Sequence, residues 1–267
     1  MMVRMLAGLV VAVATIAGGA VAGPYEDGIA AANRGDYASA LNLWAPLAEN
    51  GDARAMNNLG TMYANGQGVA QDYAKAEEFY RSAASQGFAL AQYNLGVLYS
   101  GAQGVPQDYA MAAKWYGYAA GQGNADAQYN LGHMFAKGVG IPPDYAKAAK
   151  WYRSAAEQGH AYAQNNLGTI YAKGQGVPQD YAEAAKWYRL SAEQGNAVAQ
   201  LNLGVLYADG SGVAQDRVEA ALWLNLAARQ GNASAVENRD LLAAKMTPEQ
   251  RAEAERLARE WKPKTRP

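Results

Sequence analysis

Small and apolar residues recur along most of the chain at spacings of three and four, which is the periodicity of an amphipathic helix. Two such sets are Ala91, Leu95, Leu98 and Tyr99, and Tyr109, Ala112, Ala113 and Tyr116. Glycine-rich and proline-containing segments separate the sets, and such segments end helices. The pattern therefore predicts a chain of short helices joined by tight turns.

The pattern repeats with a fixed period of 36 residues. The blocks begin, without insertion or deletion, at Ala53, Ala89, Ala125, Ala161 and Ala197. The first half of each block carries Asn-Leu-Gly-x-x-Tyr or a close variant, and the second half carries variants of Asp-Tyr-Ala-x-Ala-Ala-x-Trp-Tyr. Each half has helical periodicity, so each block predicts two helices.

Capping residues mark where the second helix of a block begins and ends. Pro106, Pro142 and Pro178 prevent a helix from extending backward through them. The aspartates that follow are predicted N-caps, namely Asp108, Asp144 and Asp180. The predicted left-handed glycines that end the second helices are Gly87, Gly123, Gly159, Gly195 and Gly231.

A single helix pair cannot fold alone, because ordering 36 residues costs roughly 50 kcal/mol, whereas burying one aromatic side chain returns only about 5 kcal/mol. Neighbouring blocks must complete each core. The repeated tyrosines and tryptophans are therefore predicted to pack between helices. The glycines of the Asn-Leu-Gly motif are predicted to let helices approach closely, and they are Gly96, Gly132, Gly168 and Gly204.

The repeated pattern resembles that of Sel1-like repeats, which are related to tetratricopeptide repeats. The resemblance covers about Asp36 to Asn232. It implies an all-α fold, a right-handed superhelical solenoid of antiparallel helix pairs, used in the family as an adaptor for protein complexes. On this basis the repeats are residues 53–88, 89–124, 125–160, 161–196 and 197–232, with an N-terminal capping half-repeat at 24–52 and C-terminal capping helices and a tail at 233–267.

The two ends differ from the repeats as capping segments should. Asp36 to Gly51 follows the second-helix pattern, with Pro46 inside it. Thr247-Pro248-Glu249-Gln250 is a capping-box arrangement that predicts a last helix running to about Trp261. We expect Lys262 to Pro267 to fray.

Residues 1–22 have the pattern of a cleaved signal peptide. Arg4 is followed by an uncharged stretch from Met5 to Ala22, which ends in the small-x-small sequence Ala20-Val21-Ala22. An uncleaved membrane anchor is the alternative, because about 18 apolar residues approach the length that spans a bilayer. We expect cleavage, no stable membrane insertion afterwards, and a location in the bacterial periplasm, with secretion as the alternative.

The composition excludes several classes of function. Half of the residues are hydrophobic, which is enough for a core, and 23 basic residues nearly balance 24 acidic ones. We do not expect the protein to bind nucleic acid, because proteins that bind nucleic acid carry an excess of positive charge. The chain has no cysteine, so disulfides, an N-terminal lipid on cysteine and thiol catalysis are excluded.

The sequence lacks the common catalytic motifs, including Ser-x-x-Lys, Gly-x-Ser-x-Gly, His-Glu-x-x-His and a phosphate-binding loop. The chain has two histidines, so a zinc site would need both His133 and His160 with carboxylates from different repeats. We therefore expect no enzyme activity, no metal and no cofactor.

Candidate binding residues lie where the blocks differ, because the shared packing does not fix such positions. In the related tetratricopeptide repeats, positions 2, 5, 9 and 13 of the first helix line a concave groove, and helical spacing puts them on one stripe. Position 2 is Arg54, Leu90, Asp126, Tyr162 and Val198; position 5 is Asn57, Tyr93, Tyr129, Asn165 and Leu201; position 9 is Thr61, Val97, His133, Thr169 and Val205; position 13 is Asn65, Gly101, Lys137, Lys173 and Asp209. The predicted partner-binding residues are Leu90, Tyr93, Tyr129, His133, Tyr162 and Leu201.

Two alternatives stay open at this stage. The stripe is either an exposed groove for an extended or helical segment of another protein, or it is packing between neighbouring first helices. The protein is accordingly either an adaptor or regulator that binds an envelope protein, such as a membrane sensor or a secretion or polysaccharide factor, or a binder of cell-wall glycan or peptide fragments with hydrolase activity of the β-lactamase type. Hydrolysis of glycan needs paired carboxylates, and the stripe has only the isolated Asp126 and Asp209.

The second helix of the block that begins at Ala89 is predicted to be less stable than its equivalents. It contains Gly117 and Gly121, and each glycine costs roughly 1 kcal/mol relative to alanine within a helix. We therefore predict a soft segment between Gly101 and Gly123.

Overall fold

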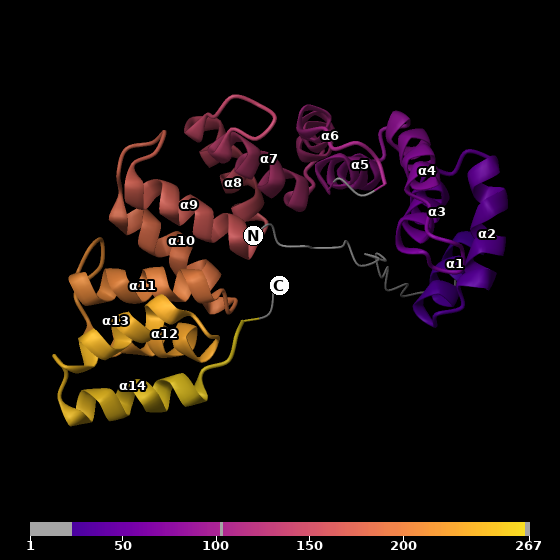
Figure 1. Ribbon diagram of the computed structural model, residues 1–267. Coiled ribbons are helices and arrows are strands. Elements are labelled where there is room, and N and C mark those ends of the chain that lie inside the picture. Colours follow the sequence, from indigo (N-terminus) through magenta and orange to yellow (C-terminus); the bar gives the residue numbers. More distant parts are fainter. Residues whose placement is uncertain (1–22, 102–103, 265–267) are drawn as a thin grey trace. The chain divides into compact units, whose positions relative to one another are not determined.

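The computed structural model describes residues 23–101 and 104–264, and these residues form fourteen α-helices and no strand (Figure 1). The predicted signal peptide, residues 1–22, lies outside the described residues. The helices are α1 Pro24–Asn33, α2 Tyr37–Glu49, α3 Ala53–Asn65, α4 Tyr73–Ser85, α5 Ala89–Gly101, α6 Tyr109–Gly121, α7 Ala125–Lys137, α8 Tyr145–Glu157, α9 Ala161–Lys173, α10 Tyr181–Glu193, α11 Ala197–Asp209, α12 Arg217–Arg229, α13 Ala233–Ala243 and α14 Pro248–Glu260.

The helices of a 36-residue block form an antiparallel pair. In the pair α9 and α10, the Asp180 N–H donates to the Tyr171 carbonyl across the turn at 3.0 Å. Further from the turn, Gly168 faces Tyr188, and Gln194 hydrogen-bonds with Gln164. Later residues of α10 therefore contact earlier residues of α9, so the two helices run in opposite directions. The predicted all-α class, built from consecutive helix pairs, is confirmed.

The predicted helix boundaries of the second helices are also confirmed. Asp108, Asp144 and Asp180 each accept a hydrogen bond from the backbone N–H three residues later. The glycines after the second helices have φ between 82° and 93°, the left-handed region that glycine adopts without strain. These two signals explain why every second helix of the repeats has the same length.

The glycines of the Asn-Leu-Gly motif allow the two helices of a pair to pack closely. A Cβ atom placed on Gly168 would lie 2.7 Å from the Tyr188 ring and 3.2 Å from the Ala184 carbonyl oxygen. Gly96 is similarly tight against Tyr116, at 2.5 Å. The sequence prediction of close approach at these glycines is correct. Gly96, Gly132 and Gly168 meet buried tyrosine rings, and Gly204 meets Leu224.

Buried glutamines connect successive pairs, a feature that the repeat pattern did not predict. The Gln164 side chain donates to the Ala156 carbonyl at the end of α8 and accepts from Gln194 of α10, at 3.1 and 2.7 Å. Gln200 makes the same two bonds with Ala192 and Gln230. A buried amide costs free energy unless it is paired, so these bonds fix the register between one pair and the next.

The chain divides into two compact units, with the boundary between Ala127 and Gln128 in α7. In the first unit each helix packs against the next from α1 to α6. At its N-terminal end, the Trp44 ring of α2 is fully buried and its Nε1 donates to the Tyr25 carbonyl of α1 at 3.1 Å. Helix α1 was not predicted from the sequence, and it gives this end a helix pair.

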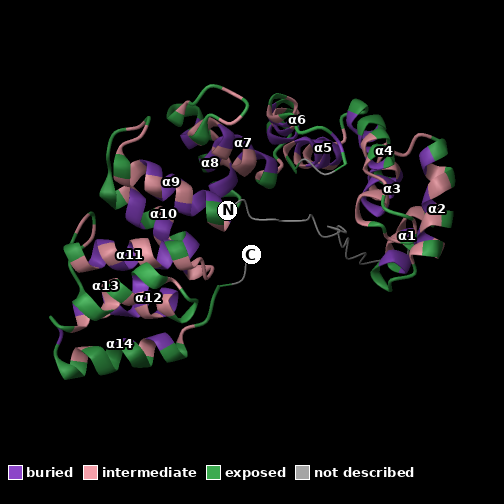
Figure 2. Ribbon diagram, viewed as in Figure 1, coloured by how far each residue is buried: buried purple, intermediate pink, exposed green. Residues whose placement is uncertain are grey.

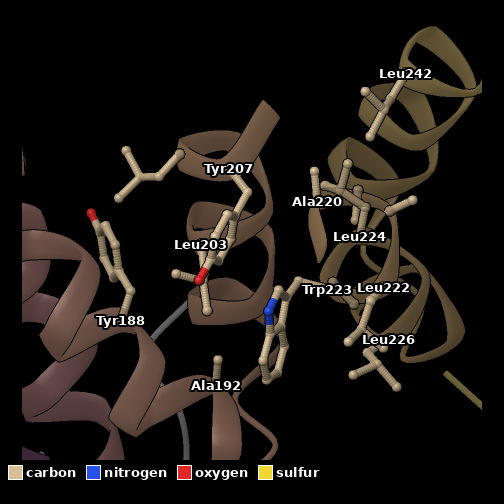
Figure 3. Packing of buried hydrophobic residues seen from close by; sticks show 14 of the residues in the cluster. Tyr188, Ala192, Leu203, Tyr207, Ala220, Leu222, Trp223, Leu224, Leu226 and Leu242 are labelled. Carbon is tan, nitrogen blue, oxygen red and sulfur yellow. The ribbon is translucent and has the colours of Figure 1, made fainter. Parts of the chain in front are cut away.

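In the second unit the helices pack in succession from α8 to α13, and α14 packs against α12 (Figure 1). Figure 3 shows Leu222 and Leu226 of α12 within the core that also contains Trp223 and Leu242. The equivalent residues of α10 are Lys186 and Leu190, both exposed. The change from Lys186 to Leu222 places a second leucine beside Leu226, and both are buried where a terminal helix covers α12.

The predicted C-terminal helix is confirmed as α14, including its capping box between Thr247 and Gln250. The prediction that the chain frays from Lys262 is wrong as far as Lys264. The Lys264 N–H donates to the Glu193 carbonyl at 2.8 Å, and its ammonium lies 2.9 Å from the Glu193 carboxylate. In the described part of the chain, no helix is both long enough and apolar enough to cross a membrane.

Candidate partner-binding surface

The first-helix stripe, meaning positions 2, 5, 9 and 13 of α3, α5, α7, α9 and α11, is neither uniformly buried nor uniformly exposed. In the second unit Tyr162 and Val198 hold position 2 of neighbouring first helices, and each is 49% exposed. Asn165, at position 5 of α9, is buried. Figure 2 shows buried and exposed positions on different sides of the same helices. In this unit the side chains at position 2 of the stripe are thus accessible, whereas Asn165 at position 5 is packed.

Four aromatic rings converge on Tyr129 of α7. Its ring centroid lies 4.6 Å from that of His160, 5.9 Å from Tyr152, 6.2 Å from Tyr162 and 6.5 Å from His133. Three of the predicted binding residues, Tyr129, His133 and Tyr162, therefore lie together with two residues that were not predicted. We call these five residues the Tyr129 cluster.

Burial raises the pKa of Tyr129, and the neighbouring Tyr162 hydroxyl adds to the effect. The phenol therefore stays neutral. Its hydroxyl hydrogen-bonds with the Asn166 side chain, which holds the ring against α9. Tyr129 is half-buried and Tyr162 is exposed, so the Tyr129 cluster presents aromatic surface that packs on buried rings. Aromatic side chains held in this way are the common anchors of protein interfaces.

His160 is a buried member of the Tyr129 cluster that the repeat pattern did not single out. It occupies the N-cap of α9, where its Nδ1 accepts from the Ala163 N–H at 3.2 Å. Its ring stacks on Tyr129 with an angle of 19° between the planes. The equivalent caps of α11 and α13 are asparagines, Asn196 and Asn232. That departure from ordinary capping chemistry was the available signal.

The side chain of His133 lies on the same face of α7, between Tyr129 and Lys137 in sequence. Burial lowers the pKa of His133, and the charge of Lys137 lowers it further. His133 is therefore neutral over most of the physiological range and contributes a ring to the Tyr129 cluster. Both histidines of the chain thus contact the same tyrosine.

The remaining predicted residues lie apart from the Tyr129 cluster. Leu201 of α11 is partly buried and packs against the C-terminal core. Leu90 and Tyr93 lie on α5 in the first unit, both partly exposed, where the Tyr93 ring is 5.9 Å from Tyr116. Each unit therefore has its own portion of the stripe, and the second unit has the larger aromatic group.

Neither histidine lies in a metal-binding group. Among the described residues, no three His, Cys, Asp or Glu side chains gather closely enough to hold a metal ion. The rings around Tyr129 offer stacking and apolar contact together with a few hydrogen-bonding atoms.

The helix pairs and the 36-residue period define a class of α/α repeat proteins, and the family follows from the sequence comparisons. The Sel1 repeat model matches residues 53–88, 89–124, 125–160, 161–196 and 197–232. The chain belongs to the Sel1 repeat family. The comparison with curated proteins found no match.

Two solved structures are similar to the chain over most of its length. One is c5321, a protective antigen of uropathogenic Escherichia coli strains displaying an SLR fold, with 34% identity and a TM-score of 0.81 over 89% of this chain and 53% of that one. The other is a Sel1 repeat protein from Oxalobacter formigenes, with 32% identity and a TM-score of 0.76 over 89% of this chain and 97% of that one. The chain thus spans about half the length of the E. coli protein and nearly all of the Oxalobacter protein.

Proposed function

We propose that this protein is a non-enzymatic adaptor or regulator that binds a protein partner in the bacterial cell envelope through the first-helix stripe. The observation that carries the proposal is the Tyr129 cluster, in which a half-exposed Tyr162 stands on a supported group of rings. Four of its five members, Tyr129, His133, His160 and Tyr162, hold positions that differ between repeats, so the shared packing does not require those side chains. The fifth, Tyr152, is the repeated tyrosine that packs against Gly132 and supports them.

Membership of the Sel1 repeat family supports a role in protein–protein interaction. The exposed aromatic and apolar residues of the second unit fit that role, because large accessible rings are more favourable when a partner covers them. Val198, on the next first helix after Tyr162, extends the accessible apolar edge.

The envelope location rests on the sequence of residues 1–22, which has the charge, length and small-residue ending of an export signal. Cell fractionation, with mass determination of the exported chain, tests both export and cleavage after Ala22.

In-cell photo-crosslinking tests the binding proposal. A photoreactive residue replaces Tyr162, and a matched control replaces Leu190, which is 45% exposed on α10 of the same repeat. We expect the probe at position 162 to capture one envelope protein and the probe at 190 to capture none. Failure of a folded, exported chain to form a protein adduct from position 162, or equal capture from both positions, would overturn the proposal.

A further inference from the structure

The first-helix stripe of the second unit ends in two positive charges. Lys137 and Lys173 are the last residues of α7 and α9, and both are exposed. Within the described residues, neither ammonium group has a carboxylate at ion-pair distance. Some other lysines of this unit do have one, such as Lys147 with Asp144 at 3.4 Å and Lys186 with Glu183. The two cations are therefore available to a partner.

These lysines share a face with the Tyr129 cluster. Tyr129, His133 and Lys137 are spaced by four residues along α7, so they lie one above the other on the helix. Lys137 lies one helical turn beyond His133 on this face, and its charge lowers the pKa of His133. On α9, Tyr162 and Lys173 occupy positions 2 and 13 of the same stripe. Aromatic surface at one end thus continues into positive charge at the other.

Stabilisation of helix ends does not account for this arrangement. A lysine in the last turn interacts favourably with the helix dipole, by typically 0.3 to about 1 kcal/mol. If that effect determined position 13, the other first helices would also carry a cation there. Helix α11 instead ends in Asp209, which is unfavourable to the dipole, and α3 ends in Asn65. The two lysines are features of α7 and α9 alone among the first helices.

We infer that the partner, given the proposed function on which this rests, presents a segment with an apolar or aromatic side chain for the Tyr129 cluster and a carboxylate for Lys137 and Lys173. Eight residues separate Tyr129 from Lys137, which is about 12 Å along a helix. An extended segment covers that distance in about four residues. The recognised pattern is therefore an apolar residue followed or preceded, about four residues away, by Asp or Glu.

Peptide display against the purified protein tests this inference. A random peptide library is selected on the wild-type chain and, in parallel, on a Lys137→Glu, Lys173→Glu double variant. The matched control is Lys150→Glu, Lys186→Glu, which makes the same change in charge at exposed positions of α8 and α10. Circular dichroism verifies that all three proteins are folded.

The wild type and the control should enrich peptides that pair an apolar residue with an acidic one at the stated spacing. The double variant should lose the acidic preference and gain a basic one. For the best selected peptide, replacing its acidic residue by the amide should weaken binding to the wild type about tenfold or more, and should leave binding to the double variant nearly unchanged.

The failure of the inference and the failure of the proposed function give different results. Peptides that need Tyr162 for binding but show no acidic preference, or keep that preference in the double variant, overturn the inference and leave the proposed function standing. Selection of purely apolar or purely cationic peptides would also overturn the inference. If the wild type enriches no peptide at all, the result contradicts both.

Discussion

Helix α9 has two faces that differ in burial and in how much their residues vary between repeats. On one face Ala163 and Leu167 are fully buried, with 0% exposure, beside Gly168. The same three residue types recur in α7 and α11, as Ala127, Leu131 and Gly132 and as Ala199, Leu203 and Gly204. On the other face Tyr162 and Lys173 are exposed, and their equivalents change in type from helix to helix.

The comparison shows how a repeat protein separates folding from recognition. Close packing dictates the first face, because each side chain there meets a neighbouring helix at van der Waals distance. The second face meets solvent along its edge, so its residues can differ without cost to the core. Substitutions on the first face should therefore change stability, and those on the second should change binding.

The largest expected effect comes from filling the packed face. Gly168→Val should lower the free energy of unfolding by about 3 kcal/mol, because the new side chain would overlap the Tyr188 ring and the Ala184 carbonyl. Tyr162→Ala, on the same helix, should cost less, about 1 kcal/mol, since half of that side chain is already exposed. Urea titration of both variants checks the prediction, and equal losses would remove the distinction between the faces.

Helix α6 tests whether a departure from the repeated pattern weakens the packed structure. Nothing lies within 4 Å of a Cβ atom at Gly117 or Gly121. Gly117→Ala should therefore stabilise the protein by about 1 kcal/mol, and Gly121→Ala, at the last residue of the helix, by less. Before substitution, hydrogen exchange should be faster in α6 than in α8. Equal protection of the two helices would show that the predicted soft segment does not exist.

His160 both caps α9 and stacks on Tyr129. Two substitutions separate its role in stability from its role in recognition. His160→Ala removes the acceptor for the Ala163 N–H and should cost about 1 kcal/mol. His160→Asn keeps an acceptor of the kind that caps α11, so stability should stay close to that of the wild type. Both variants lose the stack on Tyr129 and should bind the partner less tightly. If the asparagine variant binds normally, the stack has no part in recognition.

The smallest expected effect is a change in the free energy of unfolding with pH. Because burial and Lys137 hold the pKa of His133 below its ordinary value of 6.5, the unfolded chain binds this proton more readily than the folded one. The free energy of unfolding should therefore fall as pH drops from 6.5 toward the lowered pKa. His133→Val, the residue found at positions 97 and 205, should reduce this loss. Thermal unfolding between pH 7 and pH 5 checks it, and an unchanged pH dependence would contradict it.

Periodic features were predictable from the sequence because each was repeated several times. The capping aspartates, the left-handed glycines and the close-packed Gly168 recur in block after block, so the repetition itself indicates their physical role. The single features were not predictable. Helix α1 lies outside the repeat, and the bonds of Gln164 to two neighbouring helices depend on the stacking of successive pairs.

The Tyr129 cluster was predictable in part. Tyr129, His133 and Tyr162 stood out because they are aromatic at positions that vary between blocks, and the structure places their rings together. His160 was missed because it lies outside those positions, at a cap, and a side chain that bonds its own backbone gives no sign in sequence of the ring it stacks on. The stripe remains a predicted binding surface.

The most direct test of the separation between folding and recognition compares partner affinity in Tyr162→Ala and Leu190→Ala. The two side chains have similar exposure, 49% and 45%, and lie on the two helices of one repeat. With the envelope protein captured by crosslinking as ligand, we predict that the first variant binds about tenfold or more weakly and the second binds within about twofold of wild type. Equal affinities in the two variants would contradict the assignment of recognition to the first-helix stripe.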